Sequence, residues 1–311
     1  MSAERFLVTG ALGCIGAWTA CLLVKEGVPV TAFDLGANDS RLRLIMQPEE
    51  LERIAFVRGD VTDLEALEHT LAEHEITNVV HLAALQVPFC KADPPLGASV
   101  NVVGTVNVFE AVKRRGLSTT VAYASSAAVY DAHGELSPRT LYGVYKLANE
   151  ETARVYHQDD GVASIGLRPF CVYGPGRDQG LTSTPTLAMH AAAQGEPYRI
   201  SFGGRTQFHY APDVAAAFIR ASRTQADSAD VYDLGGPAVH MSELVRAIEA
   251  AAPAAAGTIT FDDVPLPFPE RLPGEELDLA QTPLEEGVRQ TIELFRVQRE
   301  ASAQPPPARR D

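Results

Sequence analysis

Short apolar runs alternate with longer stretches of helical spacing along the first half of the chain. The apolar runs predict buried strands, and the stretches between them carry apolar residues at the three- and four-residue spacing of amphipathic helices. The strands are expected at 6–9, 28–34, 54–58, 78–82, 119–125 and 162–168, and the helices at 15–26, 63–74, 98–115 and 141–158. Because parallel strands need a crossover between them, this alternation predicts an α/β fold with a Rossmann-type doubly wound parallel sheet.

The pattern changes after residue 170, where a segment rich in Gly and Pro begins. Beyond it the spacing predicts helices at 181–194, 212–223 and 241–252, a polar and aromatic stretch at 198–210, a strand at 231–234 and a proline-rich loop at 265–273. We therefore predict a dinucleotide-binding Rossmann domain over 1–170, with returns of the chain from about 212–252. A smaller, mainly substrate-binding lobe is expected over 171–300, and a flexible tail over 301–311.

Composition excludes several classes of protein. With 311 residues, of which 46% are hydrophobic, the chain can bury a large core, and its net charge of −14 argues against nucleic acid or an anionic membrane as a partner. The first residues are too soon interrupted by a glycine turn to form a signal peptide, and no run of about 18 apolar residues occurs. The four cysteines show no CxxC spacing, so we expect a reducing, cytoplasmic location and no metal site.

A glycine-rich turn follows the first strand directly. Gly10, Gly13 and Gly16 lie three residues apart at the start of the first helix, where backbone N–H groups and the helix dipole favour a pyrophosphate. Asp34 ends the next strand, about 20 residues further on, where a carboxylate accepts hydrogen bonds from the ribose hydroxyls of a dinucleotide. The sequence therefore predicts NAD or NADP as the cofactor.

The carboxylate of Asp34 also predicts which dinucleotide is bound. It would repel the 2′-phosphate of NADP, and the nearest basic residues, Arg41 and Arg43, come several positions too late along the chain to replace it. NAD is therefore favoured. Asp60, which follows a later strand, either caps the next turn or reaches the adenine amino group.

Tyr142 and Lys146 lie four residues apart on a predicted helix, so that their side chains share one face. A free phenol has a pKa near 10, and a neighbouring ammonium is expected to lower it until the phenolate can take a proton from an alcohol. Tyr145 has the uncharged Asn149 as its own partner at this spacing. Tyr142 is therefore the predicted catalytic base.

Two serines, Ser125 and Ser126, end the fifth predicted strand at the carboxyl edge of the sheet, where ligands of such folds bind. A hydroxyl at this place would orient the oxygen of a substrate. Two serines at a strand end are also common turn residues, so both interpretations stay open at this point.

Taken together, these motifs resemble the extended short-chain dehydrogenase/reductases, the NAD-dependent epimerase/dehydratase family. The resemblance runs in order over about residues 5–300 and is carried by Thr9-Gly-x-x-Gly-x-x-Gly16, Asp60-Val61, His81-Leu-Ala-Ala84, Asn101-Val-x-Gly-Thr105, Ser125-Ser-Ala-Ala-Val-Tyr130, Tyr142-x-x-x-Lys146, Arg168-Pro-Phe-Cys-Val-Tyr-Gly-Pro175 and Pro212-Asp-Val-Ala215.

This resemblance implies roles for particular residues. The active serine would be Ser126, beside Tyr142 and Lys146. The implied cofactor-binding residues are Gly10, Gly13, Cys14, Ile15, Gly16, Asp34, Asp60, Val61, Leu82, Ala83, Ala84, Asn101, Tyr142 and Lys146. Asp60 and Val61 would border the adenine, Leu82 to Ala84 the pyrophosphate, and Asn101 the nicotinamide half. The family also pairs protomers through the helices that contain Asn101 and Tyr142, which implies a homodimer.

Departures from the family pattern bear on the substrate. Nucleotide-sugar epimerases that this chain resembles usually carry Asn where Cys171 stands, and an arginine where Thr206 stands, with Arg205 one place off. Both family residues help to hold a diphosphate. Their replacement weakens the nucleotide-sugar interpretation, although other arginines remain available: Arg177, Arg199, Arg205 and Arg271.

Two further features favour a small substrate and no dehydration. Only sixteen positions separate Ser126 from Tyr142, so the loop that covers the sugar is short, and Ala127 and Ala128 stand where dehydratases place an Asp-Glu pair. The polar segment 177–186 either lines a polyol pocket or is a solvated loop.

We expect an NAD-dependent enzyme that moves hydride at a secondary alcohol carbon of a sugar, sugar acid or related small polyol-like substrate. Net dehydrogenation and epimerisation both stay open, and a nucleotide-sugar 4-epimerase acting on a UDP- or TDP-sugar is the nearest alternative. A non-catalytic NAD-sensing regulator is less favoured, because such proteins commonly lose the Tyr or the Lys, and both are present here.

Overall fold

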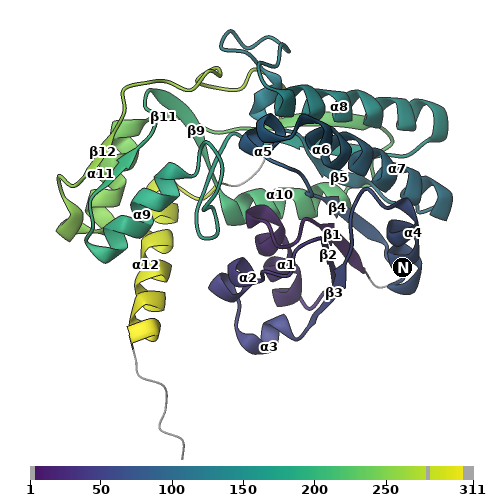
Figure 1. Ribbon diagram of the computed structural model, residues 1–311, viewed down its shortest axis with the longest axis horizontal. Helices are drawn as coiled ribbons and strands as arrows, with labels where there is room; N and C mark the ends of the chain where they lie inside the picture. Colours follow the sequence, from purple (N-terminus) through teal and green to yellow (C-terminus); the bar gives the residue numbers. More distant parts are fainter. Residues whose placement is uncertain (1–3, 278–280, 304–311) are drawn as a thin grey trace, which may run out of the picture.

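The computed structural model describes residues 4–277 and 281–303, and it confirms the doubly wound parallel sheet (Figure 1). Eight strands lie in the order β13-β10-β6-β5-β4-β1-β2-β3, and all neighbouring pairs are parallel. Their bounds are β1 Phe6–Thr9, β2 Val30–Asp34, β3 Ile54–Arg58, β4 Asn78–His81, β5 Val121–Ala124, β6 Ser164–Arg168, β10 Ala229–Leu234 and β13 Glu276–Leu277. The six strands expected before residue 170 are thus β1 to β6.

Helices cover both faces of this sheet, because its strands carry apolar side chains on both sides. Phe6 and Val8 pack into one core with α1 and α10, whereas Leu7 between them packs into another with α4, α7 and α8. The helices of this lobe are α1 Cys14–Lys25, α2 Ser40–Ile45, α3 Pro48–Leu51, α4 Leu64–Glu73, α5 Val87–Ala92, α6 Pro94–Ala98, the π-helical η1 Ser99–Val103, α7 Gly104–Arg115, the short η2 Ala127–Val129, α8 Leu141–Asp160 and α10 Ala211–Arg223.

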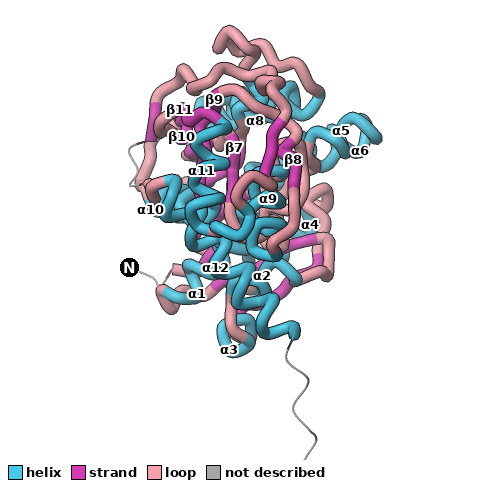
Figure 2. Tube along the Cα trace, turned by 90° about the vertical axis from the view of Figure 1, so that its left-hand side faces the viewer, coloured by secondary structure: helices cyan, strands magenta, loops and turns pink. Residues whose placement is uncertain are grey.

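The helices and strands of a smaller lobe are seen in Figure 2, and this lobe packs around a core of its own. A three-stranded sheet, β11-β9-β7, and a parallel pair, β12-β8, lie with three helices, of which α12 contacts both α9 and α11. The elements are β7 Cys171–Tyr173, α9 Thr184–Gln194, β8 Tyr198–Ile200, β9 Arg205–Tyr210, β11 Ala238–His240, α11 Met241–Ala251, η3 Pro253–Ala255, β12 Ile259–Phe261 and α12 Leu284–Ala303.

Three expectations about this half of the chain need correction. The return to the Rossmann sheet consists of α10 and β10, with the short β13 added at the edge of the sheet, and it does not extend over α11 to 252, because Leu244 and Ile248 of that helix are buried in the smaller core. The stretch 198–210, expected only as polar and aromatic, forms the two strands β8 and β9. The pattern also gave no prediction of the long helix α12. Of the predicted tail, 301–303 end α12, and 304–311 lie outside the described residues.

Candidate active site

The glycine turn between β1 and α1 forms a backbone cradle. Gly10 has a φ of +67°, and a Cβ there would lie 2.6 Å from the Ala83 nitrogen, while one on Gly16 would collide with the Gly10 carbonyl oxygen. The first turn of α1 contains no acidic residue, and its N-cap, Gly13, offers no side chain to the free N–H groups. The turn therefore presents unpaired backbone donors to an anionic group.

A buried polar chain fixes this turn against the end of β4. The Thr9 hydroxyl lies 2.7 Å from His81 Nδ1 and also accepts a hydrogen bond of 3.2 Å from the Leu82 backbone nitrogen. His81 Nε2 lies 3.0 Å from the Thr105 hydroxyl, and burial lowers the pKa of His81 to about 3, so the ring is neutral. The segment after β4 is thereby held beside the glycines.

Asp34 lies at the end of β2 and is bound by the neighbouring backbone. Its two oxygens accept hydrogen bonds of 3.0 Å from the nitrogens of Leu12 and Gly36. Arg41 lines the same cleft although it lies seven residues after Asp34 in the sequence. Its guanidinium donates to the Leu12 carbonyl at 2.9 Å and pairs with Asp178 at 2.7 Å. An arginine is therefore near the Asp34 loop, but its charge is balanced by a carboxylate.

The tyrosine, the lysine and the serines meet because α8 packs closely on the turn after β5. A Cβ on Gly143 would collide with the Ala128 carbonyl, so only glycine lets α8 approach this turn. The Lys146 ammonium donates a hydrogen bond of 2.7 Å to the Ala124 carbonyl and lies 5.6 Å from the centre of the Tyr142 ring. Both side chains, together with Ser126, line one cleft.

The electrostatics of this group differ from the expectation. Burial raises the pKa of Tyr142, and the opposing influences are the Ser126 hydroxyl and the Arg177 charge rather than Lys146. Burial also lowers the pKa of Lys146 to about 8. Lys146 is not among the groups that lower the pKa of the phenol here, because its ammonium is turned toward the Ala124 carbonyl and is itself desolvated.

The two serines have different surroundings. The Ser125 hydroxyl is buried and hydrogen-bonded to the Glu150 carboxylate. Ser126 caps the short turn η2, where its oxygen accepts a hydrogen bond of 3.2 Å from the Ala128 nitrogen, and it is near enough to Tyr142 to affect the phenol. Of the two hydroxyls, therefore, only that of Ser125 is bound to a buried carboxylate.

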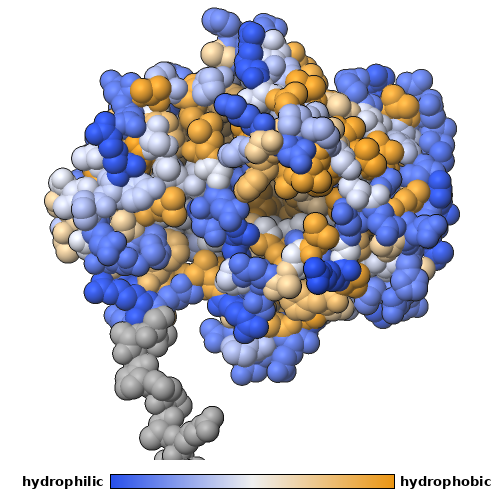
Figure 3. All heavy atoms as spheres, in the orientation of Figure 1, coloured by the Kyte–Doolittle hydropathy of each residue, from blue (hydrophilic) through white to orange (hydrophobic). Residues whose placement is uncertain are grey.

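A cleft of about 610 Å³ joins the glycine turn to Tyr142. Hydrophobic residues gather inside a hollow near the centre of the face shown in Figure 3, with hydrophilic residues around it. The predicted site residues that line the cleft are Gly10, Gly13, Cys14, Ile15, Gly16, Asp34, Asp60, Val61, Leu82, Ala83, Ala84, Ser126, Tyr142 and Lys146. Asp60 also accepts a hydrogen bond of 2.9 Å from the Thr62 nitrogen, so it fixes the turn after β3.

Asn101 is the exception among the predicted site residues. It is 1% exposed, and its amide nitrogen donates to the carbonyls of Leu85 and Gly97 at 3.1 and 2.9 Å. The π-helical turn η1 directs this side chain inward, and its neighbour Val100 lines the cleft instead. Asn101 therefore holds the segment that carries Gln86.

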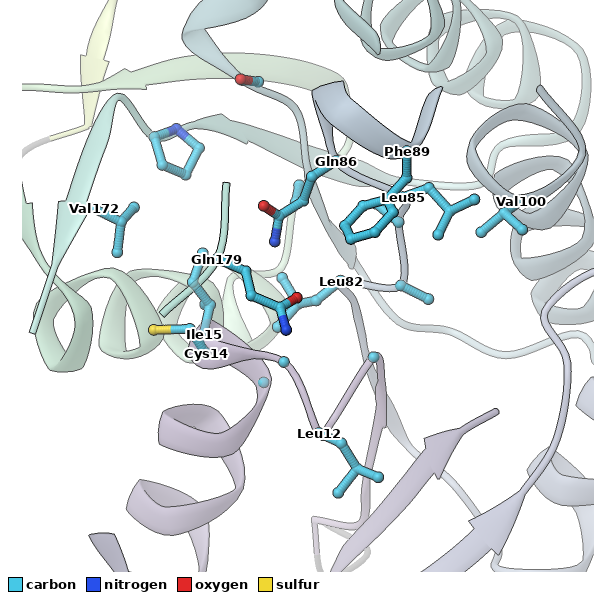
Figure 4. A pocket seen from close by; sticks show the side chains of 18 of the residues that line it. Leu12, Cys14, Ile15, Leu82, Leu85, Gln86, Phe89, Val100, Val172 and Gln179 are labelled. Atoms are coloured by element: carbon cyan, nitrogen blue, oxygen red, sulfur yellow. The ribbon is translucent and has the colours of Figure 1, made fainter. Parts of the chain in front are cut away.

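Several lining residues had no signal in the sequence. Gln86 and Phe89 enter the cleft from the segment after β4, and Phe268 enters from the proline-rich loop of the smaller lobe. Figure 4 shows Gln86 and Gln179 reaching into the pocket from different parts of the chain. Such contacts depend on how distant loops meet, which no local pattern encodes.

The sheet and the cleft define a dinucleotide-binding enzyme with a Ser-Tyr-Lys group at the end of its nucleotide site. The family model described as the NAD dependent epimerase/dehydratase family matches residues 6–235, so the chain belongs to that family. It is an NAD-dependent enzyme of the extended short-chain dehydrogenase/reductase type.

Known relatives cover nearly the whole chain. It is 29% identical to a UDP-glucose 4-epimerase from Mycolicibacterium smegmatis over 94% of this chain and 98% of that one. The solved UDP-glucose 4-epimerase of Thermus thermophilus, in complex with NAD, is 27% identical with a TM-score of 0.73, covering 94% of this chain and 99% of that one. An L-threonine dehydrogenase from Clostridium difficile is 20% identical with a TM-score of 0.82, covering 96% and 99%, and shows the shared fold alone.

The cleft suits NAD on its own chemistry. The backbone cradle at the glycines has donors for a pyrophosphate, and Asp34 provides carboxylate oxygens in the same cleft. The described residues of the chain include no helix that is both long and apolar enough to cross a membrane.

Proposed function

We propose that this enzyme moves a hydride at a secondary alcohol carbon of a sugar, sugar acid or related small polyol-like substrate. The observation that carries the proposal is the meeting of Ser126, Tyr142 and Lys146 in the cleft that begins at the glycine turn. A base, an oxygen ligand and a cation are thus placed at one end of a dinucleotide site, which is the arrangement that alcohol oxidation requires.

In this mechanism Tyr142 is the base and Ser126 holds the substrate oxygen. The hydroxyl proton passes to the Tyr142 oxygen as the carbonyl forms, and the Ser126 hydroxyl donates a hydrogen bond to the same substrate oxygen. When bound, NAD accepts the hydride that leaves the carbon, and its positive ring also lowers the pKa of the neighbouring phenol. Lys146, anchored at the Ala124 carbonyl, lies 5.6 Å from the centre of the Tyr142 ring and is the cation of this group.

The proposed cofactor contacts follow the course of the cleft. We assign the pyrophosphate to Gly10, Gly13, Cys14, Ile15 and Gly16 with Leu82, Ala83 and Ala84 beside them, the adenosine ribose to Asp34, and the adenine to Asp60 and Val61. This assignment is supported by the unpaired N–H groups of α1 and by the carboxylate of Asp34 beside the glycine turn. Asn101 is left out as a direct contact, because it is turned into the protein.

A small substrate is favoured by two residue replacements in the smaller lobe. Cys171 and Thr206, which replace two residues expected in a nucleotide-sugar enzyme, are buried in that lobe and are 1% and 0% exposed. The cleft of about 610 Å³ has to accept NAD and the substrate together. We propose that Arg177, Thr182 and Phe268 of the smaller lobe form the substrate side.

Incubation with NAD+ and a panel of sugars, uronic acids, polyols and nucleotide sugars tests the proposal. Net NADH formation, followed by absorbance, would establish a dehydrogenase, whereas conversion without net NADH would establish an epimerase. If no hydroxyl compound of the panel is converted in either way, the proposed function is wrong.

A nucleotide-sugar 4-epimerase is the alternative that the relatives favour, since the M. smegmatis and T. thermophilus proteins are both named UDP-glucose 4-epimerases. An increase in melting temperature at micromolar UDP or TDP would support this alternative over a free-sugar enzyme. The same measurement with free sugars separates the two, because a free-sugar enzyme is expected to respond to the sugar and a nucleotide-sugar enzyme to UDP or TDP.

Asp34→Ala is expected to weaken NAD binding roughly 10- to 100-fold, which corresponds to the loss of a hydrogen bond to a charged group. The preference for NAD over NADP should shrink as well, because the repulsion of the 2′-phosphate disappears. Titration of both cofactors into the variant measures the two effects. Asp39→Ala is the control, since that half-buried carboxylate pairs with Arg43, and equal NAD affinity in Asp34→Ala and wild type would refute the assignment.

We propose that two copies pair through α7 and α8 and their neighbour η1. Three valines of η1 and α8, Val103, Val144 and Val155, are 44–47% exposed, and such apolar side chains favour burial between protomers. Sedimentation equilibrium is expected to give twice the mass of one chain.

We also propose a cytoplasmic location, supported by four free cysteines, and no nucleic-acid partner, supported by the net charge of −14.

A further inference from the structure

The positive charges around the cleft are distributed unevenly. Three cationic side chains of the described residues line it: Arg41, Lys146 and Arg177. Arg41 is paired with Asp178 at 2.7 Å, and Lys146 donates to the Ala124 carbonyl beside Tyr142. Arg177 is the one of these three that has neither a carboxylate partner among the described residues nor a place in the proposed catalytic group.

Arg177 is held in a defined position. Its Nη2 donates a hydrogen bond of 3.1 Å to the Thr182 hydroxyl, and its Nε is buried without a partner in the described part of the chain. An unsatisfied buried guanidinium nitrogen is costly, so a group of this kind points to a ligand that supplies the missing acceptors. The adjacent carboxylate, Asp178, is already bound to Arg41.

Gln86 faces the same place from the other side of the cleft. Its Oε1 is also buried without a partner, and a Cβ built on Gly180 would meet this oxygen and would lie 3.2 Å from Arg177 Nη2. Gly180 has a φ of +96°, so the loop that carries Arg177 passes closely over Gln86 only because this position is glycine. Two unsatisfied polar groups, a donor and an acceptor, thus converge on one region of the cleft.

We propose that Arg177, supported by Thr182 and faced by Gln86, is a carboxylate-binding subsite, and that the substrate is therefore a polyhydroxy acid with one negative charge. The guanidinium would bind the carboxylate in two-point fashion, and the Gln86 oxygen would accept a hydrogen bond from a neighbouring hydroxyl. This inference rests on the proposed function, because it places the acid in the site where Tyr142 takes the proton.

The charge balance favours a carboxylate over a diphosphate. A diphosphate ester brings two negative charges, which call for more than one cation. The arginines of the smaller lobe that might add a second charge are paired elsewhere: Arg199 with Asp262, Arg205 with Glu243 and Arg271 with Glu276. None of these three is among the residues that line the cleft.

Arg177 and the catalytic group line one cleft. The Arg177 charge also opposes the rise of the Tyr142 pKa. A carboxylate on Arg177 and a hydroxyl on Tyr142 would therefore fix a substrate at both ends, which orients the carbon between them.

The experiment measures binding to the protein saturated with NADH, by calorimetric titration. The probes are D-gluconate, D-glucuronate, D-glycerate and D-threonate, their neutral counterparts sorbitol, D-glucose, glycerol and threitol, and UDP. At least one acid is expected to bind at least about tenfold more tightly than its neutral counterpart, and Arg177→Gln is expected to remove this difference. Arg177→Lys should keep part of it, and Arg199→Gln, which changes an exposed paired arginine, should keep all of it.

Other results would overturn the subsite. These are the absence of Arg177-dependent binding for every acid, tighter binding of UDP that is lost in Arg177→Gln, or a parallel loss of NADH affinity, which would assign the arginine to the cofactor. NADH formation from NAD+ in the same proteins separates this inference from the proposed function. Arg177-dependent binding of an acid without any conversion would support the carboxylate subsite and contradict the proposed function. Conversion of neutral sugars at a rate unchanged by Arg177→Gln would support the proposed function and contradict the subsite.

Discussion

Tyr142→Phe is expected to lower kcat by about 10²- to 10⁴-fold while NAD still binds, because the phenol oxygen is the proposed acceptor of the substrate proton. The ring stays in place, since α8 and the Ser126 turn are held by the close approach at Gly143. Loss of turnover with an unchanged affinity for NAD would show that the phenol has a chemical role and not only a structural one. Steady-state kinetics and NAD titration measure the two. In wild type, the oxidation rate should rise with pH, because burial raises the pKa of the phenol that has to be ionised.

Tyr145→Phe is the matched control for this prediction. Tyr145 lies on the same helix and donates a hydrogen bond of 3.0 Å to the Pro94 carbonyl, and it is not among the residues that line the cleft. Its variant should retain most of the wild-type turnover and the same rise with pH. If Tyr142→Phe turned over at a similar rate to Tyr145→Phe, another group would have to be the base.

The sheet and the nucleotide end of the cleft could be predicted from the sequence, because both depend on local patterns. The apolar runs and helical stretches before residue 170 became β1 to β6 and their crossovers, and the glycine turn sits where a strand meets a helix. The missed helix α12 also had a local signal, since Val288, Ile292 and Phe295 recur at helical spacing and are buried. That error was therefore avoidable.

The rest of the site depends on contacts between distant segments. Arg41 of α2 lines the cleft although it lies seven residues after Asp34, whereas Asn101, in the π-helical turn η1, is buried and bonded to the Gly97 carbonyl. The pKa of Tyr142 depends on burial and on Arg177, which lies in the loop after β7. Spacing along one helix identified the tyrosine and the lysine, but it contained no information about desolvation.

A buried charge network under the active site was equally invisible in the sequence, because its members come from three segments. Arg168, at the end of β6, donates to both Glu150 oxygens at 2.7 and 2.6 Å and lies 3.4 Å from an Asp233 oxygen. The Glu150 carboxylate also binds Ser125, the residue before the proposed active serine. Asp233 in turn accepts a hydrogen bond of 2.5 Å from the Gly274 nitrogen, so the network joins α8 and the sheet to the smaller lobe's loop.

Glu150→Ala is expected to lower the free energy of unfolding by about 3–5 kcal/mol, because it leaves the Arg168 guanidinium buried without its main carboxylate. The side chains of Arg168 and Glu150 are 9% and 6% exposed, so water cannot replace the lost partner. A fall in melting temperature on the order of 10 °C corresponds to this loss, and thermal and urea unfolding of the purified protein measure it. Glu150→Gln should cost less, since the amide oxygen still accepts one of the guanidinium bonds.

The neighbouring residue provides a stringent control. Glu151 pairs with Arg154 at 2.7 Å, but both side chains are about 60% exposed, and such surface pairs contribute less than about 1 kcal/mol. Glu151→Ala should therefore unfold almost as wild type does, although it removes the same carboxylate one position further along α8. Equal stability losses in the two variants would show that helix propensity or net charge, rather than the buried pair with Arg168, determines the effect at Glu150.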